Sequence, residues 1–198
     1  MKKLIFLDTE TTGFEPGQIA QLTYIIEHED ILTPKNFFFN VDEMSEGAAK
    51  VHGFTKERLV ELSKGQVFKD IHEQVLKDFE DSILICHNVN FDYNFLKAEF
   101  KRLEIELKLP KFCTMLHFTN ICKILNQYDK YKWPKLSELI NFYNIPENDV
   151  ITRSKELFIS DDVTFHDARF DTVGLYMAFK TALEKNDITK ETFLKSLS

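Results

Sequence analysis

One stretch decides how the chain is organised: Leu4-Ile5-Phe6-Leu7-Asp8-Thr9-Glu10-Thr11-Thr12-Gly13. The apolar run from Leu4 to Leu7 is typical of a central strand that is buried on both faces. Asp8 ends this run, and Glu10 follows two residues later. Because side chains alternate along a strand, both carboxylates project to the same side. Thr11-Thr12-Gly13 then indicates a loop, so the two acids lie at the end of the strand.

Other short runs predict the remaining strands of an α/β protein. They are Ile19–Glu27, half-buried with Ala20, Leu22, Tyr24 and Ile26 on one face; Phe37–Val41, after a turn at Pro34; Ser82–Cys86; and a short strand at Phe112–Thr114. The first three strands are close enough in sequence to form an antiparallel meander.

Apolar residues at helical spacing predict helices between and after these strands. One helical stretch begins at Ser45 and is interrupted at His52-Gly53-Phe54-Thr55, where Thr55 is the expected N-cap of the next helix. Further helices are expected over Val67–Phe79, Phe91–Leu103, a segment through Leu125, Leu136–Tyr143 and Asp167–Lys185. Residues 146–165 have no clear periodicity, and we expect a long loop there.

Length and composition indicate one globular domain. The 198 residues are 43% hydrophobic, and the 19 phenylalanines suggest a core packed largely with aromatic rings. We expect residues 1–185 to form the domain and residues 186–198 to add a short helix or tail. A net charge of −7 argues against a protein that coats nucleic acid through a broad basic surface. It does not argue against an enzyme that holds a few phosphates beside bound cations.

The three cysteines, Cys86, Cys113 and Cys122, lack the spacing of a disulfide framework. Cys113 and Cys122 with His117 match no common zinc pattern, so buried free thiols in a reducing compartment are the expected form. The apolar run near the start is too short for a signal peptide. No stretch approaches the roughly 18 apolar residues of a membrane span. We therefore expect a cytoplasmic protein with no membrane partner.

Asp8 and Glu10 form the first acidic cluster. Two acids on one side of a strand end repel each other unless a cation bridges them, and hard carboxylate oxygens suit magnesium or manganese. The alternative is that Asp8 caps a turn and Glu10 is merely solvated.

Two further acidic clusters lie at the edges of predicted elements. Asp92 follows a strand end and enters the first turn of a helix, where ligands collect in α/β sheets; the alternative is an acid favoured by the helix dipole. His166 and Asp171 are five residues apart, roughly 140° around a helix, so they converge only if His166 lies in the preceding loop. Asp167 is either a rival ligand or, as we favour, the N-cap of that helix.

Together these segments resemble the DEDD exonucleases of the RNase H-like superfold, in the subgroup that uses a histidine. The motifs that carry the resemblance are Phe6-Leu7-Asp8-Thr9-Glu10-Thr11-Thr12-Gly13, His87-Asn88-Val89-Asn90-Phe91-Asp92 followed by Phe95-Leu96, and His166-Asp167-Ala168-Arg169-Phe170-Asp171. Val51-His52-Gly53-Phe54-Thr55 is similar to the His-Gly-Ile-Thr segment of proofreading-type members. The resemblance covers about residues 1–185. Cys113-Thr114 and Thr172 depart from the usual pattern but lie outside the catalytic set.

The resemblance implies a mixed five-stranded sheet flanked by helices, an antiparallel meander followed by parallel strands. It implies a catalytic site with two magnesium or manganese ions. Asp8, Glu10 and Asp171 would hold the first ion, and Asp8 with a substrate phosphate the second; Asp92 would act directly or through a water molecule. His166, with an unperturbed pKa near 6.5, would take the proton of the attacking water.

End specificity is expected to come from the pocket around these acids. By resemblance, the backbone of Thr11-Thr12-Gly13 contacts the terminal 3′ hydroxyl. Phe14 would wedge against the last bases; its alternative is packing onto the core. The other expected substrate-binding residues are His52, Phe54, Asn88 and Phe91.

The implied reaction is hydrolysis from the 3′ end of single-stranded or frayed DNA, with release of nucleoside 5′-monophosphates. RNase T-like and oligoribonuclease-like members share the catalytic set, so RNA 3′ ends stay an alternative. A non-catalytic nucleic-acid-binding subunit is a weaker alternative, because all four acids and the histidine are present. A Gly-x-Ser-x-Gly nucleophile elbow is missing from the sequence. A DNA polymerase is a candidate partner, but the lack of a long C-terminal extension favours a stand-alone enzyme; the oligomeric state is not predicted.

Overall fold

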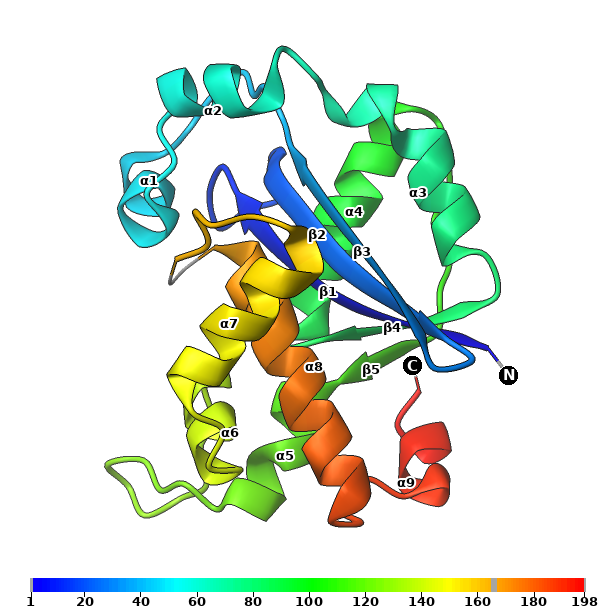
Figure 1. Ribbon diagram of the computed structural model, residues 1–198, viewed down its shortest axis with the longest axis vertical. Helices are drawn as coiled ribbons and strands as arrows, with labels where there is room; N and C mark the ends of the chain where they lie inside the picture. Colours follow the sequence, from blue (N-terminus) through cyan, green and yellow to red (C-terminus); the bar gives the residue numbers. More distant parts are fainter. Residues whose placement is uncertain (1, 165–166, 198) are drawn as a thin grey trace.

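A five-stranded mixed sheet forms the centre of the protein (Figure 1). The computed structural model describes residues 2–164 and 167–197. The strands, in the spatial order β3-β2-β1-β4-β5, are β1 (Lys3–Thr11), β2 (Ile19–His28), β3 (Ile31–Phe38), β4 (Ser82–Cys86) and β5 (Lys111–Cys113). β1, β2 and β3 form an antiparallel meander, whereas β4 pairs in parallel with β1 and β5 with β4. The expected fold is confirmed.

β1 is the central strand because its apolar run faces a core on each side. Ile5 and Leu7 belong to the core under α4 (Val89–Arg102), whereas Phe6 belongs to the core under α8 (Ala168–Glu184). The strand is longer than predicted, since it continues through Asp8 and Glu10 to Thr11. Its pairing with β2 shifts register between Glu10 and Thr11, where the strand ends.

The sequence analysis was wrong about the burial of β2. Residues 19–26 are all buried, so the strand is covered on both faces rather than half-buried. Polar residues at alternate positions suggested a solvated face, but Gln21 and Thr23 are fully buried and both bond to Asn36 Oδ1. Buried amides and hydroxyls are tolerated when each has such a partner.

The third strand was also misplaced. β3 spans Ile31–Phe38, so Pro34 lies within the strand instead of in a turn before it. Pro34 pairs with Ile25 of β2, and β3 has its other side free because it is at the edge of the sheet. An edge strand can lose one N–H donor without breaking a ladder on both sides.

Helices cover both faces of the sheet (Figure 1). The remaining helices are α1 (Glu46–His52), α2 (Lys56–Ser63), η1 (Phe68–Asp70), α3 (His72–Phe79), α5 (Thr114–Cys122), α6 (Leu136–Phe142), α7 (Glu147–Phe158) and α9 (Lys190–Lys195). α3 and α4 pack on the side of Ile5 and Leu7, and α6, α7 and α8 on the side of Phe6. Ser45 and Thr55 cap α1 and α2, as predicted for Thr55.

The long loop expected over residues 146–165 is contradicted by α7, which follows Pro146. Val150 and Ser154, four residues apart, are its buried positions, and the serine hydroxyl bonds to the carbonyl of Val150. A small polar residue at a core position hid the helical periodicity. Gly174 of α8 lets α7 and α6 approach closely, because a Cβ there would lie 2.6 Å from Ile140 Cδ1.

The C-terminal helix α9 belongs to the same domain. α9 packs on the same core as α8, since Phe193 contacts the rings of Phe112 and Phe179. The three cysteines are free, but only Cys86 is buried and the other two are half-buried. Among the described residues, the helices are too short or too polar to cross a membrane.

Candidate active site

Three carboxylates meet at the end of the sheet where β1 ends. Asp8 and Glu10 of β1 and Asp171 of α8 each offer an oxygen, and these oxygens lie within 4.8 Å of one another. Asp8 and Glu10 continue the face of Phe6, whose ring packs against Tyr176 and Phe179 of α8. Asp171 lies in the first turn of the same helix, so the packing of α8 on β1 brings the third acid to the first two.

Asp92 lies outside this cluster of three carboxylates but close enough for its charge to act on Asp8 and Glu10. It is buried in the first turn of α4, and its Oδ1 accepts hydrogen bonds from Thr9 Oγ1 at 2.9 Å and Thr9 N at 3.1 Å. Thr9 faces α4 because it lies between Asp8 and Glu10 on an alternating strand. The sequence analysis missed Thr9; its place between two candidate ligands was the available signal.

The four acids share an electrostatically crowded environment, in which Asp92 is buried and Asp8, Glu10 and Asp171 are half-buried. Burial, then the charges of Asp171, Asp92 and Glu10, raise the pKa of Asp8 well above its ordinary value. Burial and the charge of Asp171 raise the pKa of Glu10 from 4.5 to about 9. Burial raises the pKa of Asp92 to about 7, against the lowering effect of its bonds from Thr9. Ionised carboxylates in such a place need a positive partner.

Hard cations fit this donor set. Three carboxylates that converge at close range are ligands typical of Mg²⁺ or Mn²⁺, and a divalent charge would offset the repulsion that raises their pKa values. Among the residues that the structure describes, this is the one cluster of three possible metal ligands. His117 Nε2 instead bonds to the carbonyl oxygen of Asp187, which supports the rejection of a zinc site.

Asp167 is the N-cap of α8, as favoured from the sequence, and its side chain accepts from the N–H of Arg169. Its carboxylate also pairs with the buried guanidinium of Arg169, Oδ2 to Nη2 at 2.6 Å, and accepts from Gln21 Nε2 at 3.0 Å. Gln21 Oε1 accepts in turn from the N–H of Ala168. Because both oxygens of Asp167 are engaged, this network fixes the start of α8. Gln21 and Arg169 were missed by the sequence analysis.

The predicted base, His166, lies outside the described residues, as does Phe165. Its role therefore stays a prediction.

The loop after β1 is held by hydrogen bonds. Thr11 Oγ1 donates to the carbonyl of Gly13 at 2.8 Å, and the Thr12 N–H donates to the carbonyl of Gln18 at 3.0 Å. Phe14 projects from this loop with 87% of its surface exposed, so the alternative of packing onto the core is wrong. An exposed aromatic ring beside the acids is available to contact a ligand.

His52 supports this loop from α1. Its Nδ1 accepts from the N–H of Phe54 at 3.0 Å, which leaves the proton on Nε2 to donate to the carbonyl of Thr11 at 3.2 Å. Burial lowers the pKa of His52, in keeping with this neutral form. The Phe54 ring stacks on the imidazole. Both ring nitrogens are engaged within the chain, so His52 acts on the site by positioning Thr11.

Asn88 and Phe91 lie at the start of α4, near Asp92. Asn88 is exposed and adopts the left-handed conformation, φ 75°, that ends β4 and begins the helix. Phe91 is half-buried and packs against Phe95. Their position supports the prediction of substrate contacts without testing it.

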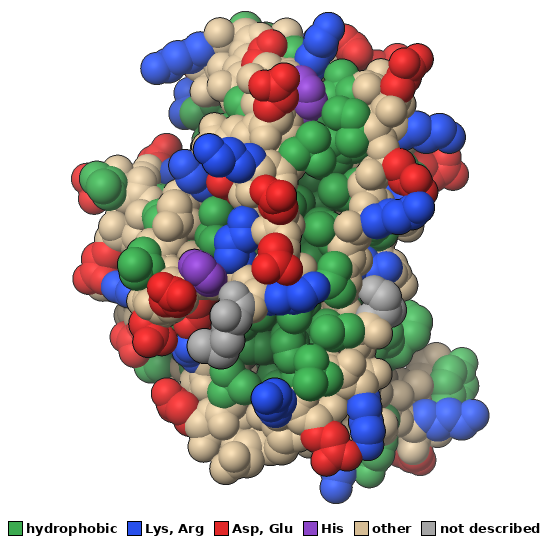
Figure 2. Space-filling model, turned by 90° about the vertical axis from the view of Figure 1, so that its right-hand side faces the viewer, with side chains coloured by type: hydrophobic (Ala, Val, Ile, Leu, Met, Phe, Trp, Pro, Cys, Tyr) green, Lys and Arg blue, Asp and Glu red, His purple; other side chains and the backbone are tan. Residues whose placement is uncertain are grey.

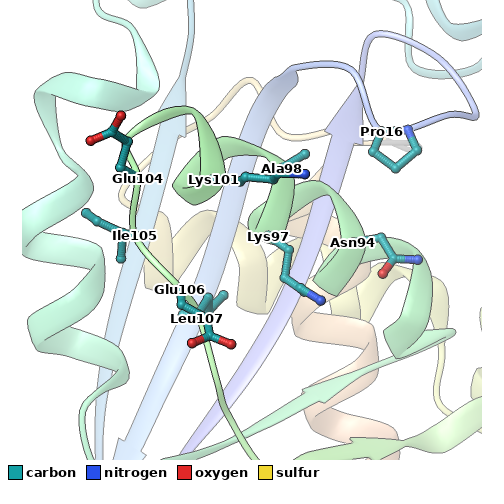
Figure 3. A pocket seen from close by; sticks show the side chains of 9 residues that line it. All are labelled: Pro16, Asn94, Lys97, Ala98, Lys101, Glu104, Ile105, Glu106 and Leu107. Carbon is teal, nitrogen blue, oxygen red and sulfur yellow. The ribbon is translucent and has the colours of Figure 1, made fainter.

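Two larger hollows lie away from the carboxylates. One, of about 570 Å³, lies along α4, where Lys97 and Lys101 and the segment 104–107 surround it, with Pro16 at one end (Figure 3). The other, of about 640 Å³, is lined by apolar residues of β1, β4, α8 and α9 and by charged residues that include those of the β2–β3 turn. It lies on the side of the molecule where apolar side chains gather near the chain ends (Figure 2). Neither includes a residue of the carboxylate cluster.

The model of the family RNase_T, described as an exonuclease, matches residues 5–150. DNA polymerase III subunit epsilon of Buchnera aphidicola is 32% identical over 134 residues, which are 63% of this chain and 55% of that protein. The same subunit of Rickettsia prowazekii is 40% identical over 111 residues, 52% of this chain and 47% of that protein. The chain spans about half the length of these curated relatives.

Solved structures share the fold. Escherichia coli exonuclease I, in complex with an oligonucleotide, superposes with a TM-score of 0.70 and 16% identity, covering 93% of this chain and 41% of that one. A 3′-exonuclease that recognises the end of the histone mRNA stem-loop gives a TM-score of 0.63 and 13% identity, covering 93% of this chain and 64% of that one.

Proposed function

This chain belongs to the RNase_T family of exonucleases, and from that premise we propose that it is a metal-dependent 3′→5′ exonuclease. Its substrate is the 3′ end of single-stranded or frayed DNA, and its products are nucleoside 5′-monophosphates. The observation that carries the proposal is the convergence of Asp8, Glu10 and Asp171 within 4.8 Å, with Asp92 bonded to the residue between the first two. The preference for DNA is supported by relatives named as DNA polymerase subunits.

Asp8, Glu10 and Asp171 would hold one Mg²⁺ or Mn²⁺ ion, and Asp8 with a substrate phosphate a second. When bound, such ions stabilise charge on the attacking and leaving oxygens of the phosphodiester and lower the pKa of water. Asp92, held by Thr9 at the start of α4, would bind an ion directly or through a water molecule. His166, directly before the cap residue Asp167 in sequence, takes the proton of the attacking water.

The remaining residues select the end of the strand. The backbone of the segment Thr11-Thr12-Gly13, held by His52, faces the terminal nucleotide, and the exposed ring of Phe14 stacks on or wedges between the last bases. Phe54, Asn88 and Phe91 complete the pocket. A second proposal is that a DNA polymerase is the partner, and only the names of the relatives support it. The free thiols support a cytoplasmic location.

The test is degradation of end-labelled oligonucleotides by the native protein and by Asp8→Asn. We expect stepwise shortening from the 3′ end in Mg²⁺ or Mn²⁺, lost in EDTA. Removing one ligand forfeits several kcal/mol of charge stabilisation, so Asp8→Asn should be slower by about 10³-fold or more. Glu191→Gln on α9, an exposed acid far along the chain, is the matched control and should keep full activity.

Parallel RNA oligomers decide between the two nucleic acids. Faster degradation of RNA than of DNA would replace the DNA proposal by the RNA alternative. Tight binding of 3′ ends without turnover in either metal, or an Asp8→Asn variant as active as the native protein, would overturn the enzyme proposal.

A further inference from the structure

A hairpin formed by residues 123–135 combines lysines with exposed aromatic rings. The pairing of Leu125 with Tyr131 closes it, with further backbone bonds from the N–H of Asn126 to the carbonyl of Lys130 and from that of Lys132 to the carbonyl of Ile124. In Figure 1 it lies at the lower left, beside α5 and α6. We call this segment hairpin 123–135.

Its aromatic side chains are turned to solvent. The exposed fractions are 72% for Tyr128, 48% for Tyr131 and 63% for Trp133. Three large rings within six residues are more than the scattered exposure of a normal surface, and such a group indicates a contact with a ligand. The turn does not need these rings for its shape, because Asn126 Oδ1 accepts from the N–H groups of Tyr128 and Lys130.

The charge of the hairpin is opposite to that of the whole chain. It has four lysines, Lys123, Lys130, Lys132 and Lys135, and a single acid, Asp129, in a chain of net charge −7. Lys132 is engaged with Glu138 at 2.6 Å. Within the described part of the chain, Lys123 and Lys130 are exposed and take part in none of the ion pairs. Lysines alternating with aromatic rings are the pattern that binds the phosphates and bases of single-stranded nucleic acid.

The base of the hairpin is hydrogen-bonded to the segment between β4 and α4. His87 Nε2 donates to the carbonyl of the buried Pro134 at 2.8 Å, next to the exposed Trp133. His87 lies between the end of β4 and Asn88, in the motif that carries Asp92. A strand whose 3′ end lies at the carboxylates and which leaves past Asn88 would therefore meet the hairpin.

We propose that hairpin 123–135 binds the part of a single-stranded substrate that lies 5′ of the nucleotides in the active site. Tyr128, Tyr131 and Trp133 stack on its bases, and Lys123 and Lys130 pair with its phosphates. The inference rests on the proposed exonuclease function, and it adds a subsite that makes the enzyme prefer long strands to short ones.

Trp133 is the only tryptophan of the chain, so its fluorescence reports on the hairpin directly. The Asp8→Asn protein in Mg²⁺ is titrated with an oligothymidylate of about 20 nucleotides, longer than the roughly 4–16 nucleotides that comparable grooves cover. We expect strong quenching, and none with the dinucleotide. Oligouridylate in parallel measures whether the subsite also accepts RNA. Unchanged fluorescence at saturation with the long strand would overturn the proposal.

Substitutions separate the hairpin from the chemistry. Trp133→Ala and Tyr131→Ala should each raise KM for the long strand about tenfold and leave hydrolysis of the dinucleotide unchanged, because one stacked base is lost in each. Leu194→Ala on α9, 54% exposed in the native protein, is the control and should change neither. Equal effects on long and short substrates would contradict the subsite.

Salt dependence tests the lysines. Lys130→Ala should reduce the slope of log K against log salt for single-stranded DNA by about 0.7, the value for one phosphate contact. Lys190→Ala, also exposed, should leave the slope unchanged. An unaltered slope for Lys130→Ala would contradict the proposed pairing of this lysine with a phosphate.

The outcomes for the hairpin and for the function are distinguishable. Quenching of Trp133 by the long strand without hydrolysis by the native protein would refute the exonuclease but not the binding role of the hairpin. Normal hydrolysis with a Trp133→Ala protein identical to the native one on long strands would refute the hairpin alone.

Discussion

Thr9 has a larger part in the site than its type suggests. Its neighbours in the strand, Asp8 and Glu10, face α8 and Asp171, whereas Thr9 faces α4 and bonds to Asp92. The alternation of side chains along β1 therefore turns two carboxylates toward α8 and a hydroxyl donor toward the carboxylate of Asp92. The two bonds from Thr9 lower the pKa of Asp92, which burial raises to about 7.

Thr9→Val tests this positioning role. The substitution keeps the volume and the backbone bond but removes the Oγ1 donor, so the pKa of Asp92 should rise and activity should fall by about 10–100-fold, the usual effect of losing an outer partner of a metal ligand. The rate is measured as a function of pH, and the acidic limb of the profile should shift to higher pH. Thr9→Ser, which keeps the hydroxyl, should restore the profile; a Ser variant as impaired as Val would indicate a packing defect instead.

At the scale of elements, α8 is the part that assembles the site. Its start is fixed by Asp167, Arg169 and Gln21, all buried and mutually bonded, and its first turn carries Asp171. The helix packs on β1 through Phe6 and on α7 and α6 at Gly174. Any change that shifts this helix moves one carboxylate relative to the other two.

Arg169→Met should destabilise the protein and reduce activity together. It leaves the carboxylate of Asp167 buried without its guanidinium partner, and breaking a buried pair costs about 3–5 kcal/mol. Urea unfolding measures the loss. Arg153→Met, which removes an exposed pair with Glu156 on α7, should cost about 0–1 kcal/mol. Equal decreases in the free energy of unfolding of the two variants would show that the network at the start of α8 stabilises the protein no more than an exposed ion pair.

Gly174→Val tests the contact between α8 and its neighbours. Its Cβ would lie 2.6 Å from Ile140 Cδ1 and its branches would also meet Val150, so overpacking should reduce the free energy of unfolding by about 1–3 kcal/mol. Gly47→Ala in α1 is the contrast, because nothing lies within 4 Å of the added Cβ. There the gain in helix propensity should stabilise the protein by about 0.5–1 kcal/mol. Thermal unfolding checks both signs.

At the scale of the whole molecule, the sheet separates two cores and leaves its acids at one end. Ile5 and Leu7 face one core and Phe6 the other, and beyond Phe6 the same face of β1 continues into Asp8 and Glu10. The apolar layers that stabilise the fold thus also partly bury these carboxylates, and this burial together with their mutual repulsion raises their pKa values. Without a divalent ion, the repulsion among the ionised carboxylates should lower the free energy of unfolding.

Stability should consequently depend on pH in a way that divalent ions remove. The pKa of Glu10 is about 9 in the folded protein and 4.5 in its ordinary state, so the folded form holds the proton more tightly. Between these values the free energy of unfolding should fall as pH rises. We expect urea midpoints in EDTA to decrease from pH about 5 to about 9, and to decrease much less in Mg²⁺, which stabilises the ionised cluster.

Glu10→Gln is the control for this experiment. It removes one titrating group, and the decrease in EDTA should become shallower. The same decrease in Mg²⁺ and in EDTA would contradict a divalent site at these carboxylates.

Most of the fold was predictable because local patterns agreed with the final environment. The apolar run before Asp8, the strand Ser82–Cys86 and the helix that begins after Asp167 have the periodicities that their burial requires. The predictions failed where polar residues are buried: Gln21 and Thr23 made β2 look half-exposed, and Ser154 concealed α7. Their partners come from distant segments, which no local pattern contains.

The sequence motifs predicted which residues form the candidate site, because their order and spacing resemble those of the DEDD exonucleases. The sequence also predicted that Asp8 and Glu10 project to the same side, because side chains alternate along a strand. The approach of Asp171 to these two acids and the bond that holds Asp92 to Thr9 were evident only once α8 and α4 were seen packed on β1. The tertiary structure also decided that Asp167 is a cap and that the rings of hairpin 123–135 are exposed. The bond between Thr9 and Asp92 and the approach of Asp171 to Asp8 depend on packing between segments more than 80 residues apart. Spacing along the chain carries no information about that packing.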